Sequence, residues 1–118
     1  MKFSIIIFAV VFSMTLSRSV NAQKAVKLDF QVSAVCSMCE ERIEKALDVK
    51  GIKMADYNLE NGHLEVVYNP KVLSEEQVHQ IVADAGHDTE KIKASDEVYN
   101  ALHDCCKYRE NSVKKCED

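Results

Sequence analysis

The stretch KLDFQVSAVCSMCEERIEKAL, residues 27–47, decides the fold class because two hydrophobic periods meet in it. Residues 27–32 alternate between apolar and polar side chains, which predicts a half-buried strand. From Cys39 onward the apolar side chains recur at helical spacing, and Gly51 ends the run. A strand, a short loop with two cysteines and an amphipathic helix are therefore expected in this order.

A hairpin is predicted next. Residues 52–59 and 64–68 have the composition of strands, and Asn61-Gly62 between them is a strong signal for a tight hairpin turn. Asn69-Pro70 ends the second of these strands.

A second helix and a fourth strand complete the predicted domain. Ser74 and Gln77 form the pattern of a capping box, and apolar side chains follow at helical spacing until Gly86. Residues 87–94, with Ile92 as their main apolar anchor, are expected as the last strand. The order βαββαβ predicts an α+β fold, a ferredoxin-like open-faced sandwich in which both helices cover one face of a four-stranded antiparallel sheet.

The two ends of the chain fall outside this unit. Residues 1–22 have one early positive charge, an apolar run and the small-residue ending Val20-Asn21-Ala22, which together predict a secretory signal peptide. The mature domain is then expected at residues 23–94, beginning with Gln23. Residues 95–118 contain Val98, Tyr99 and Leu102 at helical spacing, and we expect a short C-terminal helix and tail that pack back onto the domain.

The charge and hydrophobicity of the chain limit the kinds of partner that it can bind. Without the leader, 13 basic residues face 19 acidic ones, a net charge of about −6, which disfavours binding to nucleic acid and to anionic lipid. The apolar run of the leader is shorter than the roughly 20 residues that span a bilayer, and no later segment is apolar enough. We therefore expect a periplasmic or secreted protein without membrane insertion after cleavage.

The chain has five cysteines, all after the leader: Cys36, Cys39, Cys105, Cys106 and Cys116. In an exported protein two cysteines most often form a disulfide. Because five is odd, they cannot all pair within one chain, so at least one thiol must stay free, be capped or bind a ligand.

Cys36 and Cys39 are the primary candidates for a metal site. They fall at the start of the first helix, where unpaired backbone N–H groups and the helix dipole favour thiolates. Two soft sulfur ligands without a histidine or carboxylate in the loop favour Cu(I), Hg(II) or Zn(II) over hard cations. Zinc normally takes four ligands, so Cu(I) is the leading expectation and Hg(II) the next.

These residues resemble the heavy-metal-associated domain family, which includes copper chaperones, domains of copper-transporting ATPases and periplasmic mercuric-ion-binding proteins. The resemblance covers residues 27–94 and rests on Cys36-Ser37-Met38-Cys39 between strand and helix, Asn61-Gly62, the start of the second helix after Asn69-Pro70, and Ala85-Gly86. It implies that the position of His87, where many copper-binding members have tyrosine, faces the metal loop. His87 could therefore tune or cap the site, or it could be an exposed loop histidine.

The C-terminal cysteines leave several interpretations open. His103, Cys105 and Cys106 lie within one helical turn, and with Cys116 they could form a second or shared metal site. Adjacent cysteines point in different directions on a helix, so both could bind one ion only if the helix has ended. A disulfide from Cys105 or Cys106 to Cys116 is the alternative, and unpaired thiols are a third. His63 and His79 are interpreted as solvated side chains rather than ligands.

Two functions compete. The first is a non-enzymatic binding protein that sequesters or shuttles a thiophilic cation and passes it by ligand exchange to a metal-transporting ATPase or another metal transporter, as a monomer or a metal-bridged dimer. The second is a thiol-disulfide oxidoreductase that uses Cys36 and Cys39. The sequence has a single proline, Pro70, away from the cysteine pair, which disfavours a thioredoxin-like site.

Overall fold

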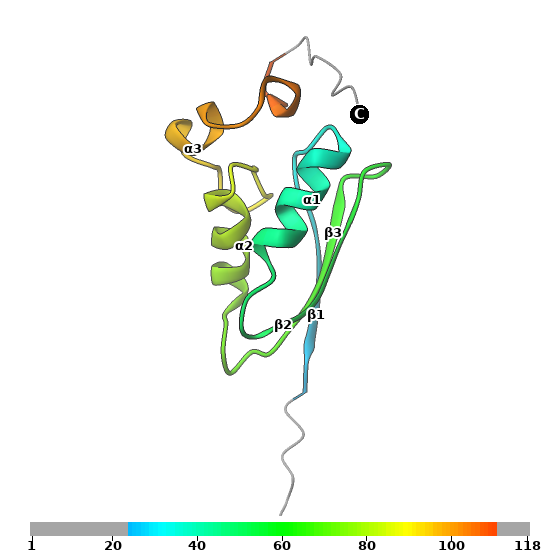
Figure 1. The fold of residues 1–118 in the computed structure, drawn as a ribbon. Helices are drawn as coiled ribbons and strands as arrows, with labels where there is room; N and C mark the ends of the chain where they lie inside the picture. The colour runs from blue at the N-terminus through cyan, green and yellow to red at the C-terminus, as the bar shows by residue number, and fades with distance from the viewer. Residues whose placement is uncertain (1–23, 111–118) are drawn as a thin grey trace, which may run out of the picture.

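A computed structural model describes residues 24–110, so the predicted signal peptide and Cys116 lie outside the described residues. The chain runs through three strands and two long helices, followed by a short helix and a 3-10 turn. Figure 1 shows the strands and the two long helices as separate layers, with the last two elements at one end.

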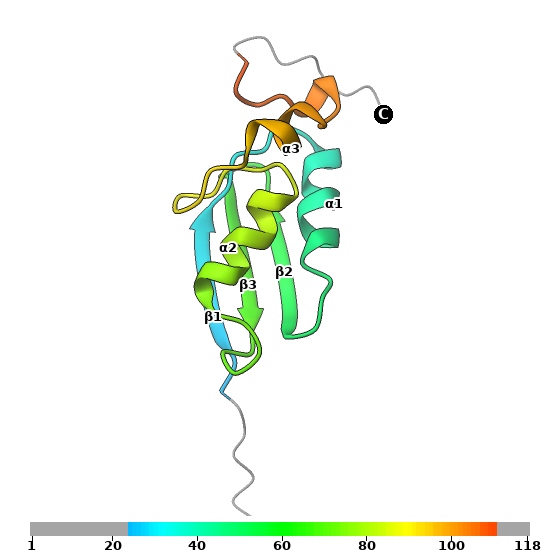
Figure 2. The same ribbon diagram turned by 90° about the vertical axis from the view of Figure 1, so that its left-hand side faces the viewer.

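The sheet consists of β1 (Val26–Gln31), β2 (Ile52–Asn58) and β3 (His63–Tyr68) in the antiparallel order β1-β3-β2. Figure 2 shows β3 between the other two strands. The turn residue Gly62 has a φ of 74°, a conformation that glycine adopts without steric cost, which explains the strength of the Asn61-Gly62 signal.

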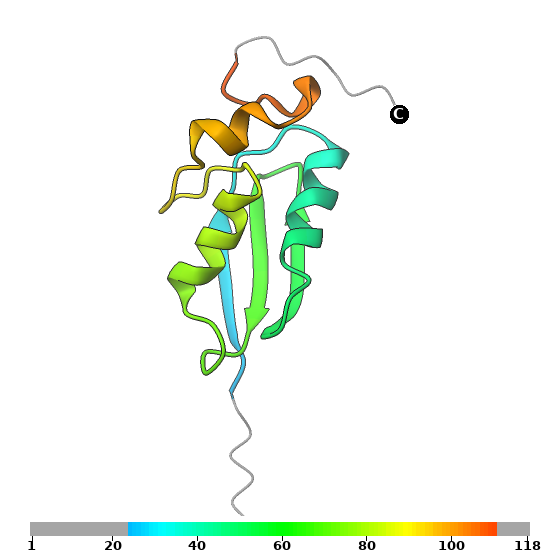
Figure 3. The same ribbon diagram turned by 60° about the vertical axis from the view of Figure 1, so that its left-hand side comes forward.

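Helices α1 (Ser37–Ala46) and α2 (Glu75–Asp84) both lie on the same face of the sheet (Figures 1 and 3). The predicted capping box at the start of α2 is confirmed: the Ser74 side chain accepts from the Gln77 backbone N–H, and the Gln77 side chain accepts from that of Ser74. The apolar faces of the sheet and helices form the core, whose buried members are Phe30, Val32, Ile43, Leu47, Tyr57, Leu64, Val66, Tyr68, Val78 and Val82.

The expected fourth strand is wrong for the described chain, where residues 87–94 make only an isolated bridge between Thr89 and Val32. Two backbone hydrogen bonds form this bridge, from the Ser33 N–H to the Asp88 carbonyl and from the Glu90 N–H to the Gln31 carbonyl. Beyond it, side chains accept from the backbone of the segment. The Thr89 hydroxyl accepts from the backbone N–H groups of Lys91 and Ile92, and the Asp88 carboxylate accepts from that of Ala94 at 2.8 Å. A segment satisfied in this way runs beside the end of β1 without extending the sheet.

The C-terminal segment, defined here as residues 95–110, contains α3 (Asp96–Asn100) and the 3-10 turn η1 (Asp104–Cys106). It lies over the end of the molecule at which α1 begins and α2 ends (Figures 1 and 2). The prediction that this part of the chain packs onto the domain is confirmed for residues 95–110. Within the described part of the chain, no helix has the length and apolar character needed to cross a bilayer.

Candidate metal centre

Cys36 and Cys39 lie together at the start of α1. Cys36 is the N-cap residue, and its carbonyl accepts from the backbone N–H groups of Cys39 and Glu40 at 3.0 and 3.2 Å. This turn brings the two sulfur atoms to 3.3 Å from each other. The sequence prediction that the pair sits at a helix N-terminus is therefore confirmed.

A third thiol, Cys106 of η1, joins the pair. Its sulfur lies 3.5 Å from that of Cys36, and all three sulfur atoms lie within 4.8 Å of one another. Among residues 24–110, this is the one group of three or more histidine, cysteine or acidic side chains whose ligand atoms converge. Cys39 and Cys106 are fully buried, whereas Cys36 is partly exposed.

The three thiols differ in their pKa values. Burial acts to raise the pKa of Cys36, but hydrogen bonds from Cys39, from Cys106 and from backbone groups outweigh it, so the net shift is downward. Burial raises the pKa of Cys39. Burial also raises the pKa of Cys106, and the neighbouring Cys39 and Cys36 thiols raise it further. Cys36 is therefore the thiol most readily ionised and the one that solvent reaches first.

Apolar side chains of the C-terminal segment enclose the sulfur atoms. Tyr99 and Leu102 are buried in one cluster with Cys39 and Cys106, and Ala34 and Tyr108 pack against it. The enclosed sulfurs are thereby shielded from water on the side of the C-terminal segment.

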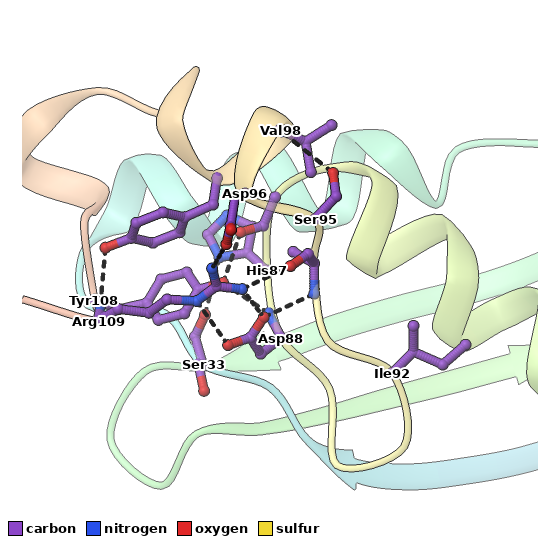
Figure 4. A network of polar contacts seen from close by, with 12 residues as sticks. Ser33, His87, Asp88, Ile92, Ser95, Asp96, Val98, Tyr108 and Arg109 are labelled. Carbon is purple, nitrogen blue, oxygen red and sulfur yellow. Dashed lines mark hydrogen bonds and ion pairs between the residues drawn. The ribbon is translucent and has the colours of Figure 1, made fainter.

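Polar contacts fix the C-terminal segment to residues 86–94, as Figure 4 shows. The Arg109 guanidinium binds both carboxylate oxygens of Asp88 and also donates to the Ala94 carbonyl at 2.7 Å. The Tyr108 hydroxyl donates to the Gly86 carbonyl at 2.7 Å and accepts from the Asp88 backbone N–H at 2.9 Å. Sequence patterns did not reveal this network, because its partners lie about 20 residues apart and follow no helical or strand period.

The interpretation of His87 as an exposed loop histidine is wrong. His87 is fully buried, and its ring stacks on that of Tyr108 with the centroids 5.5 Å apart. Its Nδ1 lies 2.9 Å from the Ser33 carbonyl, so Nδ1 carries the proton and donates. Burial lowers the pKa of His87 and favours the neutral ring. The ring supports the chain just before the cysteine loop but is not a member of the three-thiol group.

The other candidate ligands have different positions. Cys105 is disulfide-bonded and is not part of the thiol group, and His103 is exposed at the start of η1. Cys116 lies outside the described residues. Of the remaining histidines, His63 pairs with Asp29 on the exposed face of the sheet, with 2.6 Å between Nδ1 and the carboxylate. His79, expected in solvent, is instead buried, because its ring packs on Phe30 and its Nδ1 lies 2.7 Å from the Thr89 hydroxyl.

Comparison with known proteins agrees with this geometry. The heavy-metal-associated domain model matches residues 29–88, which include the second half of β1, the cysteine loop, β2, β3 and both long helices. The chain belongs to the heavy-metal-associated domain family. The copper chaperone CopZ of Staphylococcus aureus strain Newman is 35% identical over 54 residues, a match that covers 45% of this chain and 79% of the chaperone.

Solved structures of related proteins resemble this fold over more than half of the chain. A CopZ metallochaperone is 30% identical with a TM-score of 0.52, and the match covers 54% of this chain and 98% of the metallochaperone. A copper-binding domain of the P-type ATPase HMA7 is 29% identical with a TM-score of 0.53, and the match covers 57% of this chain and 92% of that domain. The chain is therefore a metal-binding protein of this family with the ferredoxin-like fold, and its matched relatives are metallochaperones and metal-binding domains. The family model ends at residue 88, so Cys106 lies beyond it.

Proposed function

We propose that this protein is an exported, non-enzymatic carrier that binds a soft cation, Cu(I) in preference to Hg(II) or Zn(II), through Cys36 and Cys39 and passes it to a metal transporter by ligand exchange. The observation that carries the proposal is the pair of sulfur atoms 3.3 Å apart at the start of α1. The lowered pKa of Cys36 favours the thiolate, which is the form that binds metal.

The donor set supports the preference for Cu(I). The converging ligand atoms are all thiol sulfurs, and soft sulfur selects Cu(I) over hard cations. A site with fewer than four protein ligands suits Cu(I) better than structural zinc, which is almost always four-coordinate. The relatives add support, since they include copper chaperones and copper-binding domains.

The exposure of the loop supports transfer to a partner. Cys36 is partly exposed, and its neighbour Met38 is 37% exposed, so an incoming thiolate can approach from this side. A metal-transporting ATPase is the receiving partner that we propose, because domains of such ATPases are among the matched structures. The carrier acts as a monomer or as a dimer bridged by the metal.

The leader supports an extracytoplasmic location. Residues 1–22 have the features of a secretory signal peptide, so we place the mature domain, residues 23–94, and its tail, residues 95–118, in the periplasm or outside the cell. The acidic mature chain has no nucleic-acid partner in this proposal.

Native mass spectrometry of the reduced mature protein tests the proposal. The protein is titrated with Cu(I), Zn(II) and Hg(II) against a competing chelator, beside the Cys36→Ser/Cys39→Ser variant. We expect one tightly bound Cu(I) that the variant fails to retain. Failure of the wild type to hold any of the three ions would disprove the proposal.

A second candidate is thiol-disulfide exchange at the same pair. A partly exposed Cys36 with a lowered pKa beside a buried Cys39 with a raised pKa is the asymmetry that such exchange uses. Pro70, however, follows the β3 end that pairs with the start of β1, at the end of the sheet away from the cysteine loop. A disulfide-reduction assay separates the two candidates, because a metal carrier is expected to turn over no disulfide substrate.

A further inference from the structure

We infer that Cys106 is a third metal ligand, so that the C-terminal segment closes a three-sulfur site over the cysteine loop. This inference rests on the proposed function, because it concerns the same cation. It goes beyond the family match, which ends at residue 88 and contains only Cys36 and Cys39 of the three.

The sulfur geometry fits one ion. Three sulfurs each about 2.3 Å from a central cation lie about 4 Å apart in a trigonal arrangement. The observed separations of 3.3 and 3.5 Å from Cys36, with all three sulfurs within 4.8 Å, are near this spacing. A linear site formed by Cys36 and Cys39 alone would need about 4.6 Å between them. To bind one ion, the three sulfur atoms therefore need only small outward shifts. For a linear site, the distance between the Cys36 and Cys39 sulfurs would have to increase by more than an ångström.

The position of Cys106 is fixed on both sides. Before it, Leu102 packs against Gly86, whose φ of 102° and lack of a Cβ let the two segments of the chain approach closely. After it, Tyr108 and Arg109 are hydrogen-bonded to Gly86, Asp88 and Ala94. Figure 4 shows this anchorage beside His87. A ligand held from both sides loses little freedom when it binds, which favours binding.

The neighbouring cysteine has a different state. Cys105 is disulfide-bonded, whereas Cys106 is a free thiol that faces the other two sulfurs. In the Cys-Cys pair, Cys105 therefore forms the covalent link and Cys106 is available to bind the metal. A buried cysteine can also be simple core packing, and the experiment below distinguishes that role from ligation.

A third ligand changes how the cation leaves. When the ion binds, the Cys106 thiol loses its proton to water as its sulfur–metal bond forms. Transfer begins when a deprotonated thiol of the acceptor forms a new sulfur–metal bond while the bond to Cys106 breaks, and Cys106 takes up a proton from water. The bonds to Cys36 and Cys39 then break in the same way as further acceptor ligands bind. The oxidation state of the metal does not change. Acceptor attack must displace Cys106, so the C-terminal segment slows release.

The test compares Cu(I)-loaded wild-type protein with Cys106→Ser and, as a control, Cys105→Ser. X-ray absorption counts the sulfur ligands, chelator competition gives affinity, and stopped-flow transfer to a chromogenic Cu(I) chelator gives the release rate. We expect three sulfurs in the wild type and the control but two in Cys106→Ser. Affinity should fall by about tenfold or more, at least the loss typical when an outer-shell partner of a metal site is removed. Release should be faster.

The possible outcomes separate the two proposals. Two sulfurs in the Cu(I)-loaded wild type, with Cys106→Ser unchanged in affinity and rate, would overturn the third-ligand assignment and leave the Cys36–Cys39 carrier intact. Loss of all binding in Cys36→Ser/Cys39→Ser, with three sulfurs in the wild type, supports both. If Cys106→Ser and Cys105→Ser lose affinity equally because the segment has loosened, the wild-type sulfur count decides: three upholds the assignment and two overturns it.

Discussion

Arg109 donates two hydrogen bonds to the carboxylate of Asp88, from Nε to Oδ2 at 3.1 Å and from Nη2 to Oδ1 at 2.5 Å. Both side chains are 20% exposed. Burial alone would raise the pKa of Asp88, but the Arg109 guanidinium and the Ala94 backbone N–H lower it. The pair connects the last residue of the matched family domain to the end of the C-terminal segment.

Replacement of Arg109 tests this connection. Arg109→Ala should lower the free energy of unfolding by about 1–3 kcal/mol, because it leaves the Asp88 carboxylate without its charged partner. Urea unfolding measures the change. Lys91→Ala is a matched control, since Lys91 pairs with Glu75 on the exposed surface and should hardly change the unfolding midpoint. Equal effects of the two substitutions would contradict the prediction.

Gly86 is expected to tolerate no side chain. In Gly86→Ala the new Cβ would lie 2.8 Å from Leu102 Cδ2 at a φ of 102°, so both strain and overpacking act. Gly62→Ala is the control, because its φ of 74° is also strained but its nearest neighbour, the Val32 carbonyl, is 3.7 Å away. Gly86→Ala should be the more destabilising by about 1–3 kcal/mol, the usual cost of overpacking. Thermal and urea unfolding of both variants would show this order, and the reverse order would contradict it.

The buried histidines make stability dependent on pH. Burial lowers the pKa of both His79 and His87 below 6.5 in the folded state, so the unfolded chain binds more protons once the pH falls below that value. Their contribution to stability is present above about pH 6.5 and is lost as the pH falls through the folded-state pKa values. The urea midpoint of the metal-free protein should therefore decrease when the pH is lowered from 7.5 to 5.5. His79→Gln, which can still bond to Thr89, should show a smaller fall, and an unchanged fall would exclude a role for His79.

Tyr57 is expected to secure the chain just before the cysteine loop. Its hydroxyl is buried and donates to the Val32 carbonyl at 2.9 Å, and burial raises the pKa of Tyr57 to about 12. Tyr57→Phe should cost about 1–2 kcal/mol, since the carbonyl loses its partner in a buried site. Tyr57→Leu removes the ring as well and should cost more. A Phe variant as stable as the wild type would show that Val32 finds another donor.

The regular elements were predictable because their signals are local. The alternation in β1, the Asn61-Gly62 turn and the Ser74 capping box each depend on side chains a few residues apart. The segment after α2 was not predictable in this way. Beyond the bridge between Val32 and Thr89, the side chains of Thr89 and Asp88 accept from backbone N–H groups that a strand would pair, and no period in the sequence predicts this.

The candidate site was predictable in part for the same reason. Cys36 and Cys39 are three residues apart on one helical turn, so their proximity follows from the sequence. The sequence could name Cys105 and Cys106 as candidates but could not choose between them, because the choice depends on the 3-10 turn and on the contacts of Tyr108 and Arg109. His87 was misjudged because the ring that covers it, Tyr108, comes from 21 residues further along the chain.

The position of Lys24 determines how the protein can be handled in the laboratory. The described chain begins at the end of β1 opposite to the start of α1, as Figure 1 shows, and Cys36 caps that start. Six residues of strand separate the two ends by about 20 Å. Attachment to a sensor chip or bead through a linker placed before residue 24 would therefore leave the thiol end facing solution, free to meet an acceptor.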